Sequence, residues 1–487
     1  MTWPDHPVIY EVNTAVWLAE VGPTLGDVAP DEGDRITPPG VDAVWLMGVW
    51  ERSPAGVRLA LDSPEQMAGF REALPDLTEA DVIGSAYCVR RYVVDARFGG
   101  RAGLAAARSA LAERGVRLVV DFVPNHVAPD HPWLAEHPER FVRGSPEDLA
   151  RDPDAFLAVG DAVIARGRDP FFAPWPDVAQ LDAFAPGLRA AAAATLADIA
   201  TQADGVRCDM AMLLLADVFT RTWGERVGPA PGAEYWAEVI GAVRAAHPDF
   251  LFAAEAYWDL EWDLQQLGFD HCYDKRLYDR LVAGAPDPAG VRAHLGADVG
   301  YQRRLVRFLE NHDEPRAAAV LRSARERAAA VAVATLPGAT LWHDGQFEGR
   351  RVRVPVFLGR RPSEPPDEDL RRFSLDLVAA VAGRRRGEWA LASATGWPGD
   401  LSCDGLLCWA WRDGAARTLV VVNDAPGPAA ARVQVPWADV AGRSWRLDDL
   451  LSGDSFLRDG DEVAAAGLYV GLPPWGCHVL AWTPAPH

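Results

Sequence analysis

The stretch ADGVRCDMAM, residues 203–212, has the apolar character of a buried strand but carries a cation, Arg207, and an anion, Asp209. Ionised side chains rarely enter a protein core unless they are paired. Alternate residues of a strand share a face, so Arg207 and Asp209 point the same way. Val206 and Met210 then point the other way, toward covering helices. We therefore expect the charged pair to form the floor of a pocket at the end of this strand.

Seven other runs have the near-continuous apolar character that a strand covered on both faces needs. With the stretch above, the eight runs span residues 8–18, 42–50, 117–126, 205–212, 250–258, 269–273, 305–313 and 339–347. Helical patterns separate them, as over residues 100–115. Eight strand–helix units predict an α/β fold of the (β/α)8 TIM-barrel type.

One interval of this pattern is too long for a single unit. Asp121 and Asp209 are 88 residues apart, whereas a typical unit takes roughly 30 residues. The excess lies between His126 and Gln180 and is rich in proline and aspartate. We therefore predict that an inserted subdomain spans residues 127–180, after the third strand. The barrel itself should comprise residues 1–126 and 181–385.

The pattern changes after about Arg386. Short alternating strands follow, separated by glycine, proline and aspartate, at residues 406–413, 418–424, 431–437 and 476–483. Such a series predicts a C-terminal antiparallel β-sandwich over residues 386–487.

The bulk composition narrows the classes of function and the compartment. The 487 residues are 49% apolar and 24% charged, with a net charge of −21, which disfavours a nucleic-acid partner. No run of 18 apolar residues predicts a membrane span, and the first residues lack the pattern of a signal peptide. Six cysteines show no Cys-x-x-Cys spacing. We expect a cytoplasmic protein with free thiols and no membrane partner.

Polar residues also end three other predicted strands. They are Asp121, Asn125 and His126 after the third strand, Glu255 after the fifth, and Asn311, His312 and Asp313 after the seventh. A lone aspartate at a strand end is usually a helix cap, but barrel active sites lie at the carboxyl ends of the strands. Three carboxylates meeting there suit glycoside cleavage, in which one attacks, one donates a proton and one holds the sugar.

The four strand ends, DFVPNH, GVRCD, AAEAYW and ENHD, resemble the four signature regions of the α-amylase family (glycoside hydrolase family 13). They occur in the order of the family and near its usual separations. The resemblance covers nearly the whole chain and implies the same barrel, insertion and C-terminal β-domain. The segment GSAYCVRRY, residues 84–92, resembles a further tyrosine-containing segment of the family.

The resemblance implies a role for each of seven residues. These are Asp209 as nucleophile, Glu255 as general acid/base, Asp313 as transition-state stabiliser, Arg207 as the residue that orients and ionises Asp209, His126 and His312 as hydrogen-bond partners of the sugar, and Tyr87 as an aromatic platform. Four tryptophans, Trp50, Trp175, Trp258 and Trp342, are further candidates for stacking on sugars.

Two departures from the family pattern affect the expected substrate. Starch-cleaving members usually carry Lys-His after the nucleophile, where this chain has Met212 and Leu213, and Arg91 replaces the aspartate of the tyrosine segment. Both changes weigh against binding of long glucans. In calcium-binding members the asparagine at Asn125 is a ligand; we expect no required cofactor and no metal, with calcium at Asn125 left as an alternative.

The expected function is a retaining α-glycoside hydrolase acting on small α-glucosides or oligosaccharides through a covalent glycosyl–aspartate. An α-glucosyl transferase using the same intermediate is the alternative, because an acceptor can replace water. A third, less favoured hypothesis is that the protein is a non-catalytic relative that binds carbohydrate. In each case the expected partner is a small carbohydrate, and the sequence does not indicate the oligomeric state.

Overall fold

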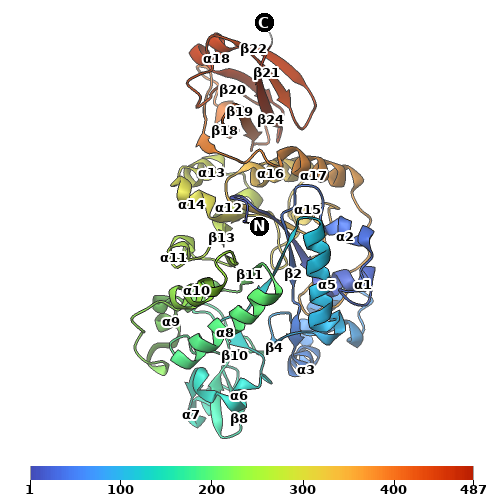
Figure 1. The fold of residues 1–487 in the computed structure, drawn as a ribbon, viewed down its shortest axis with the longest axis vertical. Coiled ribbons are helices and arrows are strands. Elements are labelled where there is room, and N and C mark those ends of the chain that lie inside the picture. The colour runs from blue at the N-terminus through green and yellow to red at the C-terminus, as the bar shows by residue number, and fades with distance from the viewer. Residues whose placement is uncertain (1, 486–487) are drawn as a thin grey trace.

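The computed structural model describes residues 2–485 and contains a closed barrel of eight parallel strands. The strands are β1 (Val8–Asn13), β2 (Ala43–Met47), β5 (Arg117–Phe122), β11 (Gly205–Cys208), β12 (Leu251–Ala254), β13 (His271–Tyr273), β14 (Leu305–Arg307) and β15 (Ala339–His343). Strand β15 pairs with β1 and closes the sheet. The predicted (β/α)8 fold is confirmed, with all eight strands in the predicted runs (Figure 1).

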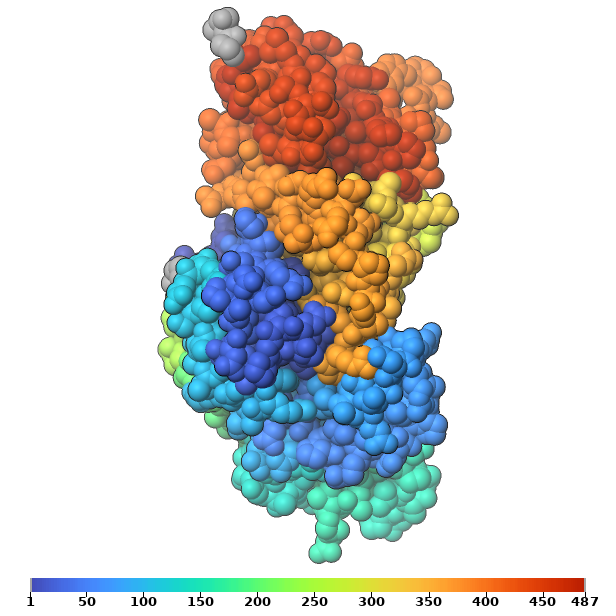
Figure 2. Space-filling view, turned by 90° about the vertical axis from the view of Figure 1, so that its right-hand side faces the viewer, coloured from blue at the N-terminus to red at the C-terminus, as the bar shows by residue number. Residues whose placement is uncertain are grey.

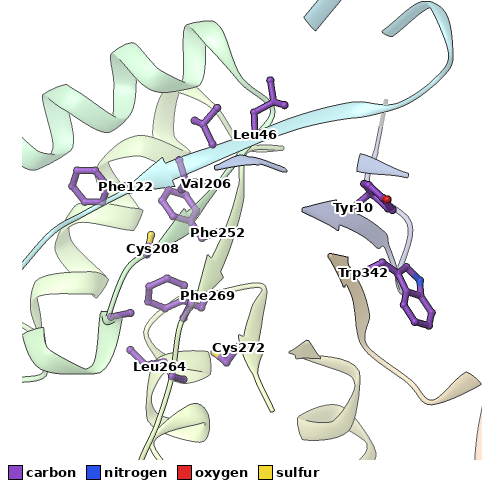
Figure 3. Packing of buried hydrophobic residues seen from close by; sticks show 14 of the residues in the cluster. Tyr10, Leu46, Phe122, Val206, Cys208, Phe252, Leu264, Phe269, Cys272 and Trp342 are labelled. Carbon is purple, nitrogen blue, oxygen red and sulfur yellow. The ribbon is translucent and has the colours of Figure 1, made fainter. Parts of the chain in front are cut away.

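Alternate strand residues belong to two separate cores. Outward-facing residues such as Tyr10, Leu46, Val206, Phe252 and Trp342 join the large cluster that packs beneath the helices (Figure 3). Inward-facing residues, among them Ile9, Trp45, Val119, Tyr273 and Leu341, fill the interior of the barrel. The barrel is therefore packed through its middle, and only the ends of the strands are left to form a site.

Some of the predicted apolar runs are longer than the strands, because a helix begins within the run. The run over residues 8–18 contains the start of a helix, because the Asn13 side chain accepts a hydrogen bond from the Val16 amide at 3.4 Å and caps α1. The helices around the barrel include α1 (Thr14–Val21), α2 (Pro30–Ile36), α5 (Gly100–Glu113), α8 (Pro186–Gln202), α9 (Ala216–Trp223), α10 (Tyr235–Ala246), α11 (Glu261–Gln266), α12 (Lys275–Val282), α13 (Pro288–Leu295), α14 (Val299–Arg303), α15 (Ala317–Val320), α16 (Ser323–Thr335) and α17 (Glu368–Val381).

A second excursion, which the sequence analysis did not predict, leaves the barrel between β2 and β5. The run over residues 42–50 is broken at Gly48, whose φ of +78° turns the chain and whose added Cβ would lie 2.8 Å from the Cβ of Ala86. The excursion contains β3 (Trp50–Arg52), α3 (Pro54–Asp62), α4 (Pro64–Ala73) and β4 (Val89–Val94), with β3 antiparallel to β4.

The long interval after β5 forms small sheets and short helices of its own. The pair β6 (His126–Val127) and β10 (Ala179–Gln180) joins its two ends, and a three-stranded sheet has the order β7 (Arg143–Gly144), β9 (Ala162–Ala165), β8 (Phe156–Val159). Helices α6 (Trp133–Glu136) and α7 (Pro146–Arg151) complete this segment, which lies at the far end of the molecule from the carboxyl terminus (Figure 1).

The C-terminal part is an antiparallel β-sandwich. Its six-stranded sheet has the order β16 (Glu388–Leu391), β18 (Leu406–Asp413), β19 (Ala416–Asn423), β24 (Cys477–Pro484), β21 (Ser444–Asp449), β22 (Ser455–Asp459), and its three-stranded sheet the order β17 (Ser393–Thr395), β20 (Ala429–Gln434), β23 (Leu468–Leu472). A separate apolar core fills the sandwich. The C-terminal part packs directly against the rest of the molecule (Figure 2). At this contact Trp411 Nε1 of β18 donates to the carbonyl of Thr335 in α16 at 2.8 Å.

Within residues 2–485, none of the helices combines the length and the apolar character that a membrane span requires.

Candidate active site

The site begins at the turn that follows β11. The strand ends at Cys208, and Met210 adopts the left-handed conformation, with φ of +43°. Met210 packs against the outer core that contains Val206, as expected, and it also lines a cavity at the barrel mouth. The Met210 amide donates to Oε2 of Glu255 at 2.6 Å. A backbone conformation that is costly for a non-glycine residue thus holds one carboxylate beside another.

One guanidinium joins the two carboxylates. Nη1 of Arg207 donates to Oδ1 of Asp209 at 2.7 Å, and Nη2 lies 2.8 Å from Oε2 of Glu255. The Arg207 side chain is only 2% exposed, which is tolerable because both neighbours carry opposite charge. The charged pair of the 203–212 stretch therefore has a third member, supplied by the end of β12.

Aromatic rings surround the same guanidinium. Its Cζ lies 5.3 Å from the ring centre of Trp45, 5.2 Å from that of Tyr87 and 5.7 Å from that of Tyr273. Cation–π attraction in such a desolvated setting adds to the ion pairs. The rings fix the plane of the guanidinium, so that its two terminal nitrogens point at the two carboxylates.

Burial acts on the pKa values of both carboxyl groups. Burial raises the pKa of Glu255 to about 7, with the charges of Asp209 and Asp313 adding to the rise and Arg207 opposing it. Burial also raises the pKa of Asp209, against the pull of Arg207. Arginine therefore lowers the pKa of Asp209 as the sequence suggested, but burial sets the net direction.

A third carboxylate lies across the mouth, at the end of β14. His312 Nε2 lies 2.9 Å from Oδ2 of Asp313, whose side chain is 44% exposed toward the cleft. Although burial works against it, the neighbouring His312 brings the pKa of Asp313 down to about 2. The imidazole pKa is in turn raised well above its usual value, because Asp313 and Glu11 outweigh the effect of burial. Asp313 is thus an anion held by a cation.

Glu11 is a site residue that the sequence analysis missed. It lies on β1, is fully buried, and its Oε1 is 2.5 Å from Nδ1 of His312. Its other oxygen has no hydrogen-bond partner within residues 2–485. The signal was present in the sequence: Glu11 interrupts the apolar run VIYEVN on the inward-facing side, two residues after Ile9. An unpaired acid at such a position predicts a buried partner.

Tyr87 contacts both charged groups of the mouth. Its ring stacks on His312 with centroids 5.2 Å apart and planes 22° apart, and its hydroxyl lies 2.7 Å from His312 Nε2. The same ring faces the guanidinium of Arg207. Tyr87 therefore links the Asp313 side of the cleft to the Asp209 side.

These residues surround a cavity of about 320 Å³. It is lined by Ser85, Tyr87, His126, Trp175, Asp177, Val178, Asp209, Met210, Glu255, Tyr257, Asp313 and Phe357. Five of the seven predicted site residues are in this lining. Arg207 lies beneath it between the carboxylates, and His312 lies behind Asp313.

His126 faces the cavity from the inserted segment. Its ring lies 5.2 Å from that of Trp175, and burial lowers its pKa to about 4, so the imidazole is neutral. A neutral imidazole can accept or donate a hydrogen bond to a sugar hydroxyl without adding charge.

Asn125 is hydrogen-bonded to the side-chain amide of Gln180. Gln180 Nε2 donates at 2.9 Å to both the backbone oxygen and Oδ1 of Asn125. A calcium ion prefers six to eight oxygen ligands, several of them carboxylates. Among residues 2–485, no three His, Cys, Asp or Glu side chains gather as a metal site. The donor set around Asn125 does not fit calcium.

Asp121 supports the site from below. Its carboxylate accepts from Trp45 Nε1 at 3.2 Å and from the Gly48 amide at 2.7 Å, and burial raises its pKa to about 6. The residue thus orients the ring that covers Arg207 and anchors the Gly48 turn, at which the excursion between β2 and β5 starts.

The four candidate tryptophans have different positions. Trp175 lines the cavity, whereas Trp258 is not among the lining residues and lies edge-on to the exposed Phe171, with ring centroids 4.9 Å apart. Trp50 and Trp342 are 1% and 2% exposed, so the suggestion that they stack on sugars is wrong. Both rings pack in the core between the barrel and the surrounding helices.

The two residues that replace the usual Lys-His pair are also buried. Met212 and Leu213 lie in the short turn after β11 and pack into the core beneath the helices. No cation from these positions reaches the cleft; of the lining residues, Met210 and Tyr257 hydrogen-bond to Glu255.

Comparisons with known proteins agree with this fold. No family model matches the chain. A curated relative, the alpha-amylase MalA of Haloarcula japonica, is 26% identical over 390 residues, which are 78% of this chain and 49% of the relative. The chain thus spans about half the length of that relative.

Solved structures resemble the chain over its whole length. A maltogenic alpha-amylase AmyB from Thermotoga neapolitana has a TM-score of 0.69 at 18% identity, covering 98% of this chain and 99% of the other. A cyclic alpha-maltosyl-(1→6)-maltose hydrolase from Arthrobacter globiformis has a TM-score of 0.63 at 19% identity, covering 98% of both chains. Strand-end motifs, barrel, insertion and β-sandwich agree with these comparisons: the chain is similar in sequence to an alpha-amylase and shares the fold of the solved structures.

Proposed function

We propose that this protein is a retaining glycoside hydrolase that cleaves α-glucosidic bonds of small α-glucosides or oligosaccharides. The observation that carries the proposal is the arrangement of three acids around one cavity, two of them sharing one guanidinium and the third paired with an imidazole. Asp209 and Glu255 share the Arg207 guanidinium, while Asp313 is paired with a cationic imidazole. The names of the sequence relative and of the structural neighbours support the same class of substrate.

In this mechanism the Asp209 carboxylate attacks the anomeric carbon and forms a covalent glycosyl–aspartate. Glu255, with a pKa of about 7, donates its proton to the leaving oxygen and then removes a proton from the incoming water. The proton relay suits neutral pH, because a carboxyl group titrating there is present in both forms.

The remaining side chains bind the sugar in place. Asp313, an anion over a wide pH range, accepts hydrogen bonds from ring hydroxyls as the sugar flattens in the transition state. Neutral His126 supplies a further hydrogen bond, and the Tyr87 ring supplies an apolar surface in the cavity wall. No step needs a cofactor, and we propose none.

The chemistry leaves open a transferase that passes the glycosyl group to a sugar or polyol. We place the activity in the cytoplasm, an assignment supported by six free cysteines, several of them buried. The carbohydrate is the proposed partner; the net charge of −21 argues against nucleic acid.

The test is a substrate screen across maltose, isomaltose, sucrose, trehalose, glucosyl-polyols and starch, followed by anomer-resolved NMR. We expect α-anomeric product from small α-glucosides, at rates above those on starch. An initial β-anomer would exclude the retaining mechanism. Adding an acceptor sugar separates the two functions, because a transferase then yields coupled products and a hydrolase yields free sugar.

A further inference from the structure

The side chain of Tyr257 lies beside the proposed proton donor, although the sequence analysis gave it no role. Its hydroxyl donates a hydrogen bond to Oε1 of Glu255 at 2.9 Å, and both side chains line the cavity at the barrel mouth. Tyr257 is partly buried and packs against the core beneath the helices. Double displacement itself requires no hydroxyl at this position, so the contact needs an explanation of its own.

The backbone that follows Tyr257 has an unusual conformation. Glu255 and Tyr257 are two residues apart at the end of β12, so an extended chain directs both side chains to the same side. Trp258 and Asp259 then adopt the left-handed conformation, with φ of +61° and +63°. Two consecutive non-glycine residues in this region cost free energy, and such strain is found where the position of a side chain matters.

Neighbouring elements support this turn. Asp259 forms an ion pair with Arg276 of α12, and the Leu260 amide donates to the Tyr257 carbonyl at 3.3 Å. Helix α11 begins directly after Leu260. The strained conformation is therefore held from both sides, and it keeps the Tyr257 hydroxyl at the carboxyl group.

The two oxygens of Glu255 have different partners. Oε2 accepts from the Met210 amide at 2.6 Å and lies 2.8 Å from Nη2 of Arg207. Both of those nitrogens are donors only, so a proton on Oε2 would face their hydrogens and find no acceptor. Oε1 has the Tyr257 hydroxyl as its partner, and a hydroxyl can both donate and accept. The proton of the acid form therefore belongs on Oε1, the oxygen that must then meet the leaving group.

The Tyr257 hydroxyl keeps its own proton throughout. Burial raises the pKa of this hydroxyl well above its ordinary value, and the charges of Glu255 and Asp313 add to the rise, against the opposing effect of Arg207. The group therefore changes the direction of its hydrogen bond and not its protonation state. It can accept from the carboxylic acid and donate to Oε1 once the carboxylate has formed.

We propose that Tyr257 is a positioning residue for acid/base catalysis, which holds the proton of Glu255 on Oε1 and stabilises the carboxylate that remains after the proton has left. The inference rests on the proposed function and makes the role of Glu255 more specific. In the first step the Oε1–H bond breaks, the proton passes to the leaving oxygen, and the Tyr257 hydroxyl turns to donate to Oε1. In the second step the attacking water gives a proton to Oε1 as its oxygen bonds to the anomeric carbon and releases Asp209, and the hydroxyl turns back.

The substitution Tyr257→Phe tests the proposal by removing the hydroxyl and keeping the ring. A hydrogen bond to a charged acceptor is stronger than one to a neutral acceptor, so Tyr257 favours the carboxylate form of Glu255. Its loss should raise the pKa of Glu255 and move the alkaline limb of kcat/KM for an unactivated α-glucoside to higher pH, by about one unit. The charged groups that act on this carboxyl group are unchanged in the variant; they are Arg207, Asp209 and Asp313.

Two substrates separate this role from a purely structural one. An unactivated α-glucoside such as maltose needs a proton at its leaving oxygen, whereas α-glucosyl fluoride does not. At about pH 6 we expect Tyr257→Phe to lower kcat/KM for the unactivated substrate about tenfold, because the developing carboxylate loses a hydrogen bond. The value for the fluoride should change less than about twofold.

A second variant predicts a shift of the opposite sign. Incorporation of 3-fluorotyrosine at position 257 gives a more acidic hydroxyl, which is a stronger donor and a weaker acceptor. The carboxylate form of Glu255 should then be favoured further, and the alkaline limb should move to lower pH than in the wild type.

Tyr235→Phe is the matched control. The Tyr235 hydroxyl is buried without a hydrogen-bond partner within residues 2–485, and the residue lies in α10, outside the cavity lining. This variant should match the wild type in its pH profile and on both substrates. Circular dichroism and the melting temperature check that each variant folds.

The outcomes distinguish failure of this inference from failure of the function. If the wild type is active but the alkaline limb of Tyr257→Phe coincides with that of the wild type, or if both substrates lose equally, Tyr257 serves the fold alone. If the wild type cleaves neither an unactivated α-glucoside nor the fluoride, the proposed function itself is wrong.

Discussion

Glu11 of β1 and His312 of the loop after β14 form a buried hydrogen bond of 2.5 Å, and this bond favours the charged form of the imidazole that holds Asp313. His312 has a carboxylate on each ring nitrogen, which raises its pKa well above the ordinary value. The charge state of Asp313, which lines the cavity, therefore depends on a residue that does not line it.

Replacing Glu11 by glutamine should lower the pKa of His312 and weaken catalysis. We expect kcat/KM to fall about tenfold, equivalent to about 1.4 kcal/mol of transition-state stabilisation. Histidine-selective NMR titration measures the imidazole pKa directly, and Glu11→Asp should restore part of the shift. An unchanged His312 titration in Glu11→Gln would show that Glu11 serves the fold alone.

Glu255 should set the alkaline limb of the activity profile. Its pKa of about 7 means that the proton donor is lost as pH rises through neutrality, so kcat/KM for an unactivated α-glucoside should fall above about pH 7. A glucosyl fluoride needs no protonation of its leaving group. Glu255→Gln should therefore form the intermediate from the fluoride while failing on maltose; equal losses on both substrates would contradict the acid role.

Glu255 should also cost stability at alkaline pH. A carboxyl group whose pKa rises on folding stabilises the protein below its ordinary pKa of 4.5, and that contribution is lost as pH passes 7. Glu255→Gln should accordingly melt at a higher temperature than the wild type at pH 8.5, and the gain should shrink at pH 5. Calorimetry at both values checks the sign.

Asp209→Asn should abolish turnover and leave the fold intact. An amide is a poor nucleophile, so kcat should fall by about 10³-fold or more, while Arg207 keeps its contact with Glu255. Circular dichroism and the melting temperature provide the structural control. Appreciable residual activity in this variant would remove Asp209 as the nucleophile.

Arg361→Met should destabilise the protein by leaving Asp344 without its partner. Breaking a buried pair of this kind costs about 3 kcal/mol. Arg361, despite burial, helps to keep the pKa of Asp344 below its ordinary value, so the difference from wild type should vanish as pH falls and the carboxylate is protonated. Arg372→Met is the control, because the Arg372–Asp369 pair is exposed and worth little.

The sequence predicted the parts of the molecule that depend on local pattern. The eight barrel strands follow from apolar runs, and the positions of Asp209, Glu255 and Asp313 from the rule that parallel strands end at one edge. The excursion after β2 was missed, because Trp50 continues the apolar run of Met47 and only the conformation of Gly48 breaks it.

Other features depend on contacts between distant segments. The sharing of Arg207 between Asp209 and Glu255 requires the left-handed turn at Met210, which no propensity predicts for methionine. The burial of Trp50 and Trp342 follows from packing between barrel and helices. A further cavity, of about 610 Å³, is lined by α4 and by residues 352–357, which follow α4 by some 280 residues in the chain.

The left-handed backbone at Met210 couples the position of Glu255, the proposed proton donor, to that of Asp209, the proposed nucleophile. The amide of Met210 donates to Glu255, and Met210 directly follows Asp209 in the chain. A displacement of this turn therefore moves both acids together. Substitutions near the cavity should therefore either leave the distance between the two carboxyl groups unchanged or disrupt it completely. We expect few variants of intermediate activity.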